Sequence, residues 1–188
     1  MSYEQTIADI VANDPYRMRA LQALRSLCLP DAMICAGFVR NLVWDHLFQT
    51  HRPLNDIDVI YYCQKDCSVQ RDLELEQKLR LREPLMPWSV KNQARMHLRN
   101  NDPVYQSSLD AMRYWPEKET AVGAVLDSSG QIIIKHCFDL ESLFKGQITH
   151  NPAKPVAVFN ERVKRKNWLT FWPKLRVNVS DSHASKMP

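Results

Sequence analysis

Hydrophobic positions follow two different periods along the chain, and together they predict helices interleaved with strands. Apolar residues three and four positions apart indicate amphipathic helices, whereas short β-branched and aromatic runs indicate strands. The ranges predicted as helices are 4–12, 16–28, 39–48, 73–81, 91–99, 107–115, 139–144 and 156–168. The ranges predicted as strands are 32–36, 56–62, 88–90, 120–126 and 131–137.

Proline, glycine and short polar residues separate these elements. Asp14-Pro15 is typical of a helix start, and Asp127-Ser128-Ser129-Gly130 between two β-rich runs is typical of a hairpin. No stretch is long enough to act as a linker between domains. We therefore predict one mixed α/β (α+β) domain over residues 1–179, followed by a flexible polar tail over residues 180–188.

The glycine content excludes two common kinds of phosphate-binding loop. The chain has 188 residues, 45% of them hydrophobic and 24% charged, which is typical of a globular protein with its own core. Its four glycines (Gly37, Gly123, Gly130 and Gly146) cannot be arranged as GxGxxG or as GxxxxGK followed by Ser or Thr. A Rossmann dinucleotide loop and a P-loop are therefore excluded.

Positive charge is concentrated near the C-terminus. The formal net charge is +4, yet the segment from Glu161 to Arg176 holds six basic residues and one acidic residue. Aromatic side chains lie between these charges, so the segment could bind an anionic partner such as nucleic acid. A solvated amphipathic helix with its aromatic residues in the core is the commoner explanation of such a pattern.

The cysteines and the N-terminus predict a cytoplasmic location. Five cysteines do not make a disulfide framework, and Cys28 and Cys35 lie in apolar surroundings, which favours a reducing compartment. No signal peptide is evident, and no apolar run approaches the ~18 residues of a membrane span, so no membrane partner is expected. A zinc site built on Cys63 and Cys67 with Cys137 and His136 is an alternative use of the thiols, although the CxxxC spacing has no second half in the sequence.

Two acidic residues on one predicted strand carry the strongest chemical signal. Alternate side chains of a strand share a face, so we expect Asp56 and Asp58 to point the same way. Burying two like charges is costly, and a divalent cation removes that cost. Mg²⁺ uses one or two carboxylates together with substrate phosphates and water. The structural alternative is that Asp56 caps a turn after Asn55 while Asp58 pairs with an arginine.

A glycine upstream supplies the second half of the pattern. Gly37 lies where an apolar strand becomes a helix, so free amides of the helix start are available to a phosphate chain. Arg40 and Asn41, one turn later, could donate hydrogen bonds to phosphate or sugar. The alternatives are that Gly37 is an ordinary turn residue and that Arg40 lies on the surface.

Together these residues resemble the DNA polymerase β-like nucleotidyltransferase superfamily, which is marked by a small-residue helix start and a strand carrying Asp-x-Asp. The pattern Gly37-x-Val39-Arg40 followed by Asp56-Ile57-Asp58 is similar to the head domain of bacterial tRNA CCA-adding enzymes and poly(A) polymerases. A small bacterial family known only as nucleotidyltransferase-like is more similar still, over about residues 21–177. The segments that carry this similarity are Trp44-Asp45, 53–59, 91–97, Trp115-Pro116-Glu117, 120–122 and Trp172-Pro173.

The resemblance implies a fold, a cofactor and an activity. The fold is polymerase β-like, with a small mixed sheet flanked by helices and with added helices at both ends. Asp56 and Asp58 would bind one or two Mg²⁺ ions, for which Mn²⁺ can substitute, and the helix start at Gly37 and Phe38 would bind the triphosphate with Arg40. The activity would be transfer of a nucleoside monophosphate from an NTP to a hydroxyl acceptor, with release of pyrophosphate.

Two further groups of residues could extend this site. Lys91, Asn92 and Arg95 form a polar cluster that could line the nucleotide site, or a polar helix start whose arginine pairs with a carboxylate elsewhere. In the basic segment, the residues that could contact the acceptor are Arg162, Lys166 and Trp168.

The sequence also departs from the family pattern. Phe38 stands in place of a second small residue, and Asn41 stands where CCA-adding enzymes have aspartate. Near the predicted strand at residues 88–92, where active members carry a third carboxylate, the chain offers Ser89 and Asn92.

Glu117 and Asp127 could supply that third carboxylate only if the strand order brings them close. With 188 residues there is no room for the helical domains that grip tRNA, so tRNA repair is not expected. We therefore expect a Mg²⁺-dependent nucleotidyltransferase with an unidentified acceptor. The alternatives are a catalytically inactive nucleotide- or nucleic-acid-binding module of the same fold and a structural protein without a nucleotide role.

Overall fold

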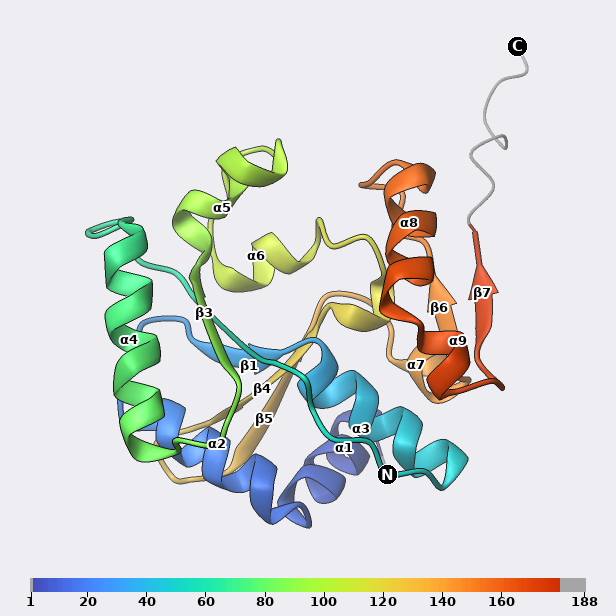
Figure 1. The fold of residues 1–188 in the computed structure, drawn as a ribbon, viewed down its shortest axis with the longest axis horizontal. Coiled ribbons are helices and arrows are strands. Elements are labelled where there is room, and N and C mark those ends of the chain that lie inside the picture. Colours follow the sequence, from blue (N-terminus) through green and yellow to red (C-terminus); the bar gives the residue numbers. More distant parts are fainter. Residues whose placement is uncertain (1, 180–188) are drawn as a thin grey trace.

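A computed structural model describes residues 2–179, in which helices cover a mixed sheet (Figure 1). The tail predicted at residues 180–188 lies outside the described residues. The strands are β1 (Met33–Cys35), β2 (Ile57–Tyr61), β3 (Trp88–Asn92), β4 (Val122–Leu126), β5 (Ile132–His136), β6 (Gln147–Thr149) and β7 (Arg176–Asn178). The helices are α1 (Tyr3–Ala12), α2 (Pro15–Arg25), α3 (Gly37–Phe48), α4 (Val69–Arg82), α5 (Gln93–Asn100), α6 (Ser108–Met112), the 3-10 turn η1 (Lys118–Thr120), α7 (Glu141–Phe144), α8 (Val156–Lys166) and α9 (Trp168–Phe171).

The main sheet has five strands in the order β3-β2-β1-β4-β5. Strands β2 and β3 are parallel, so the chain must cross over between them, and α4 makes that crossover. The other neighbouring strands are antiparallel, and β6 and β7 form a separate parallel pair. The predicted small mixed sheet, flanked by helices and with helices added at both ends, is confirmed.

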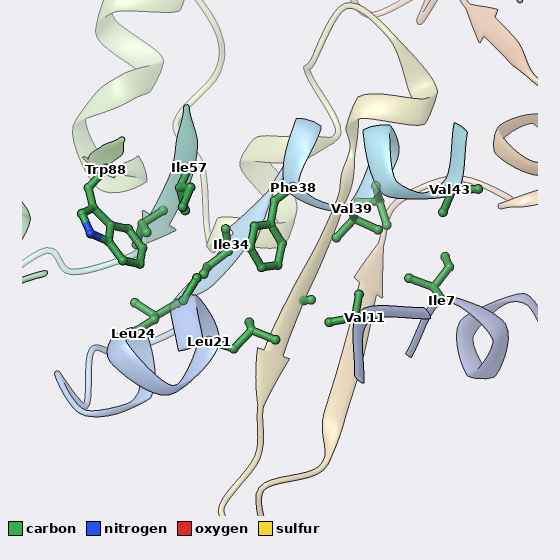
Figure 2. Close-up of a cluster of buried hydrophobic side chains, with 14 of the residues drawn as sticks. Ile7, Val11, Leu21, Leu24, Ile34, Phe38, Val39, Val43, Ile57 and Trp88 are labelled. Carbon is green, nitrogen blue, oxygen red and sulfur yellow. The ribbon is translucent and has the colours of Figure 1, made fainter. Parts of the chain in front are cut away.

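One face of this sheet carries most of the core. Figure 2 shows Ile34, Ile57 and Trp88 from three neighbouring strands packed with Leu24 of α2 and Phe38 of α3. Because side chains alternate along a strand, the intervening residues point to the opposite face. There a smaller apolar cluster forms from Met33, Cys35, Ile60, Met112 and Ala121. The rest of that face is available for a site.

Helix starts agree with the local capping chemistry. The Asp14 side chain accepts a hydrogen bond from the Arg17 amide with Pro15 at the first helical position, and Ser68 does the same for Arg71 at the start of α4. No helix in the described part of the chain is long and apolar enough to cross a membrane.

Several element boundaries differ from the prediction. The strand expected at 88–90 continues to Asn92, because that segment pairs along its whole length with β2, and α5 therefore begins at Gln93. The helix predicted over 156–168 ends at Lys166 because Asn167 adopts a left-handed conformation (φ 52°). The three-residue strands β6 and β7 are too short to leave a periodic signal in the sequence.

Candidate functional site

The two aspartates lie at the start of the central strand β2. Asp58 is aligned with Cys35 on β1 and with Ser89 on β3. Its neighbours Ile57 and Val59 are fully buried in the main core, so the alternation of the strand turns Asp58 to the opposite, open face. Asp56 immediately precedes the strand, and about half of its side chain is exposed.

The two carboxylates influence each other electrostatically. Burial raises the pKa of Asp58 to about 6, and the nearby negative charge of Asp56 contributes in the same direction. Three cations act against this shift, namely Lys166, Arg40 and Arg162. The Lys166 ammonium lies 4.0 Å from the Asp56 carboxylate. The pair is thus a negative site surrounded by positive charge.

The donor set of this pair suits a cation that shares its ligands with a substrate. Carboxylates are hard oxygen ligands, and Mg²⁺ combines one or two of them with phosphate oxygens and water. Among residues 2–179, no group of three or more His, Cys, Asp or Glu side chains is arranged to hold a metal ion. Asp56 and Asp58 could therefore hold Mg²⁺ only with ligands from a bound substrate and water. In the described residues, Cys63 and Cys67 are likewise not part of any group of three or more such side chains that could hold zinc.

Helix α3 begins beside the aspartates with an unusual turn. Its N-cap residue, Ala36, has φ 59° and ψ −124°, a conformation that residues with a side chain rarely adopt. The first amides to bond within the helix are those of Val39 and Arg40, which donate to the Ala36 carbonyl. The Gly37 and Phe38 amides come before them and have no intrahelical acceptor.

Glycine at position 37 avoids a close contact with the Asn41 side chain. The three atoms nearest to a Cβ built there all belong to the Asn41 side chain, with Nδ2 at 3.2 Å. The Phe38 side chain is buried in the core, and its carbonyl accepts a hydrogen bond from Arg17. Phe38 can therefore offer a ligand its backbone amide but not its ring.

Arg40 is a buried structural residue as much as a site residue. Its guanidinium donates to the Thr120 hydroxyl (2.6 Å) and to the side-chain oxygen Oδ1 of Asn41 (2.9 Å) and lies over the rings of Trp44 and Trp168. Burial lowers the pKa of Arg40 to about 10, so it stays charged at neutral pH. This arrangement fixes the start of α3 against η1 and α9.

The predicted cluster on β3 and α5 divides between two roles. Lys91 faces the open side of the sheet. The fully buried Asn92 side chain instead donates to the carbonyls of Cys63 and Asp66 and caps α5 at Ala94. Arg95 pairs with a buried aspartate, Asp72, as in the structural alternative. Of the three, only Lys91 is placed to meet a ligand in the site.

The basic segment folds over the aspartates as α8 and α9. Arg162 forms a paired hydrogen bond with the fully buried Glu117 (2.6 and 3.2 Å), and Lys166 lies near Asp56. Trp168 is buried against Trp44 and Arg40. The segment therefore has a core face, as the amphipathic interpretation expects, and it also contributes cations to the site.

Each aspartate lines a different cavity. The larger, about 870 Å³, lies over the open face of the sheet and includes Asp58 in its lining. Residues of α5 and α8 line it, and Figure 1 shows these two helices on either side of α6. The smaller, about 170 Å³, lies at the start of α3 and is lined by Asp56, Gly37, Arg40, Asn41, Arg52, Asn55, Lys166 and neighbouring apolar residues.

The strand order decides the question of a third carboxylate. The residue directly beside Asp58 on β3 is Ser89, which has no charge. Asp127 lies in the β4–β5 turn, at the opposite end of β4 from Gly123, which pairs near Asp58. Glu117 is close enough to Arg40 and Arg162 to influence this site, but it is buried and paired. No third carboxylate in the described residues lies beside the pair without a cation partner.

Several cavity residues carry no local signal in the sequence. Arg99, Lys154 and Arg165 line the larger cavity with Tyr114 and Trp115. They come from four separate segments, so only the tertiary structure brings them together. The basic segment around Arg165 was the one part of this wall that composition could indicate.

Comparison with known proteins identifies the family. The sequence matches the nucleotidyltransferase family over residues 22–177. A protein whose NMR structure was described as revealing a CCA-adding enzyme head domain is similar over 94% of this chain and 96% of its own, with a TM-score of 0.83 and 32% identity.

Two larger proteins share the fold. A CCA-adding enzyme in complex with CTP has a TM-score of 0.53 at 13% identity, and a tRNA-processing enzyme complex has 0.51 at 16%. The similarity covers 92% and 85% of this chain but 43% of each of those chains. No curated protein is similar enough to match the chain.

Proposed function

The chain belongs to the nucleotidyltransferase family, and on that premise we propose that it transfers a nucleoside monophosphate from an NTP to a hydroxyl acceptor in a Mg²⁺-dependent reaction that releases pyrophosphate. One observation carries the proposal. Asp56 lines a small cavity at the amide-rich start of α3, and Asp58 lines a large cavity over the open face of the sheet. In-line transfer at a phosphorus atom needs the attacking and leaving groups on opposite sides, and two cavities at one carboxylate pair support this reaction.

The small cavity suits the part of the triphosphate that leaves. The unbonded amides of Gly37 and Phe38 can donate to phosphate oxygens, and Lys166 adds positive charge on the other side. Arg40 adds its positive charge to the same cavity, and its contacts to Thr120 and Trp168 hold the helix start in place. These groups would stabilise the negative charge that develops on pyrophosphate as it departs.

The aspartates would hold the cation at the reacting phosphate. When bound, Mg²⁺ neutralises phosphate charge and aligns the attacking and leaving oxygens. The chain's own part is to keep both carboxylates on one side of β2, with Arg162 and Lys166 close enough to favour the ionised form of Asp58. The acceptor oxygen bonds to the α-phosphorus, the bond to the bridging oxygen breaks, and the hydroxyl proton passes to water.

A catalytically inactive binding module remains the second candidate because of Ser89. That residue occupies the position beside Asp58 at which a further carboxylate would help to activate the acceptor hydroxyl. A protein of this kind would bind an NTP with the same groups but would not cleave it.

The decisive experiment compares Asp58→Asn with a matched control, Asp9→Asn, which changes an exposed carboxylate on α1. Wild type and both variants are incubated with α-³²P-labelled NTPs, Mg²⁺ and a cell extract, and labelled acceptor and released pyrophosphate are measured. We expect Asp58→Asn to reduce turnover by about 100-fold or more, because it removes a group that positions charge at the reacting phosphate. The control should keep wild-type turnover.

Thermal melting of the same proteins separates the candidates. Full turnover by a folded Asp58→Asn variant would contradict the role given to this carboxylate. A wild-type protein that is stabilised by NTP and Mg²⁺ but labels no acceptor would instead be the inactive binding module.

A further inference from the structure

The end of the large cavity at β3 and α5 carries positive charge that the protein does not neutralise. Lys91 and Arg99 both line it, and no carboxylate among residues 2–179 forms an ion pair with either. The Lys91 ammonium only donates to the neighbouring Val90 carbonyl, at 3.0 Å. Other cations of the cavity are paired, Lys154 with Asp102 and Arg162 with Glu117.

The two unpaired cations lie away from the triphosphate end of the site. Along β2 the order is Asp56, Asp58 and Ile60, and Lys91 is the residue aligned with Ile60 on β3. The small cavity lies at the Asp56 end, beside Gly37. Arg99 is farther still, on α5, which begins directly after Asn92, the last residue of β3. Lys91 and Arg99 are therefore on the opposite side of the carboxylate pair from the start of α3.

The geometry of in-line displacement links the start of α3 to the end of the large cavity that holds Lys91 and Arg99. The attacking oxygen and the leaving group must lie on opposite sides of the α-phosphorus. If pyrophosphate leaves toward the start of α3, the hydroxyl must approach from the large cavity. Whatever else the acceptor carries then extends toward Lys91 and Arg99.

We propose that this end of the cavity binds the acceptor and that the acceptor carries a phosphate group near its reactive hydroxyl. The inference rests on the proposed function and names the acceptor class for it. Lysine and arginine together suit a phosphate, because the guanidinium offers a planar pair of donors and the ammonium a mobile point charge. Apart from Asp58, the carboxylates in the same cavity do not cancel this charge, since Asp102 is paired with Lys154 and Glu161 lies next to Arg165.

The same chemistry is found in two kinds of acceptor. One is a free phosphorylated compound with a hydroxyl group, and the other is the end of an RNA strand, where a phosphodiester adjoins the terminal ribose. Tyr114 and Trp115 line the same cavity and would lie beside either ligand. The test must therefore use a probe for each source.

The test follows binding directly, so it does not depend on turnover. Three probes are titrated into ¹⁵N-labelled protein: ribose 5-phosphate, ribose, and a tetraribonucleotide. Each titration is made with and without Mg²⁺ and the α,β-methylene analogue of the NTP that stabilises the protein most. The amide signals of residues 91–101 report on the proposed site. We expect shifts with ribose 5-phosphate or with the tetraribonucleotide, which identifies the source, and none with ribose.

The second experiment measures binding to a double variant that carries Lys91→Gln and Arg99→Gln. We expect it to weaken binding of the phosphate probe by tenfold or more and to leave binding of the NTP analogue within about twofold of wild type. The matched control, Lys78→Gln with Arg82→Gln, removes the same charge from exposed positions on α4 and should change neither.

Each contrary result has a distinct meaning. The proposal is overturned if neither phosphate probe shifts these signals, or if the double variant weakens the NTP analogue as much as the probe, because the cations would then hold the triphosphate. A phosphate probe that binds as expected to a protein that labels no acceptor would overturn the proposed function and leave the anion site standing.

Discussion

Asp58 is a residue placed where its charged form is disfavoured. Burial and the neighbouring Asp56 raise its pKa to about 6 from the ordinary value of 3.8. The folded protein therefore binds a proton at Asp58 more readily than the unfolded chain does. Folding is favoured by this group below pH 4, where the carboxyl is protonated in both states, and less so at higher pH. That contribution is lost as the pH rises through 6. Function and stability therefore make opposite demands on this side chain.

We expect Asp58→Asn to stabilise the protein at pH 8 in the presence of EDTA. Asparagine cannot ionise, so the variant should gain about 1–3 kcal/mol in the free energy of unfolding. The gain should disappear at pH 4, where Asp58 is protonated in the wild type. Urea unfolding at both pH values measures this, and an equal difference at both would show that Asp58 does not titrate as described.

At the scale of elements, the turn from β1 into α3 places the helix start beside β2. Ala36 makes this turn at φ 59° and ψ −124°, where its Cβ is strained. The strain persists because both sides of the turn are fixed. The Ala36 amide donates to Val122 on β4, and its carbonyl accepts from Val39 and Arg40. The geometry of the amides at Gly37 and Phe38 depends on this turn.

Ala36→Gly should therefore increase stability. Relief of the strain is worth roughly 1–2 kcal/mol, and the greater freedom of glycine in the unfolded chain offsets part of it, so we expect a net gain of about 0.5–1 kcal/mol. The control is Ala157→Gly in the exposed first turns of α8, where the same change should cost up to about 1 kcal/mol. Denaturant unfolding shows whether each change raises or lowers the free energy of unfolding. A loss of stability in both variants would refute the strain argument.

At the scale of the whole molecule, long-range ion pairs hold α8 over the sheet. Arg162 reaches Glu117, 45 residues earlier in the chain, and Lys154 reaches Asp102, 52 residues earlier. Phe159 adds a fully buried side chain from α8 to the core. Because α8 forms one wall of the large cavity, these contacts determine the width of the site.

The Arg162–Glu117 pair should show strong coupling. Arg162→Met leaves the buried Glu117 carboxylate without a partner and should lower the free energy of unfolding by about 2–4 kcal/mol. Adding Glu117→Gln removes the uncompensated charge, so the double variant should lose clearly less than the sum of the two single changes. A double-mutant cycle by urea unfolding measures the coupling, and additive losses would show that the pair contributes little.

Most of the elements could be predicted from the sequence because their signals are local. Alternation in Asp56-Ile57-Asp58-Val59 placed Asp58 on the polar side of β2, and the change from an apolar run to helical spacing at Gly37 located the start of α3. The sequence offered two roles for Asn92 and Arg95, in a ligand site or at a polar helix start, and could not decide between them. A polar residue looks the same in the sequence whether it faces a ligand or, like these two, satisfies buried partners 20 or more residues away.

The sequence by itself determined the Asp-x-Asp strand, the glycine at the helix start and most of the helices and strands, because each depends on residues close together in the chain. The mixed sheet was expected only from the resemblance to a known family. Only the tertiary structure decided that Ser89 lies beside Asp58, that Glu117 is closed off by Arg162, and that Lys91 and Arg99 share a cavity with Asp58. Such contacts follow from strand order and from the packing of helices far apart in sequence, and no local pattern encodes them.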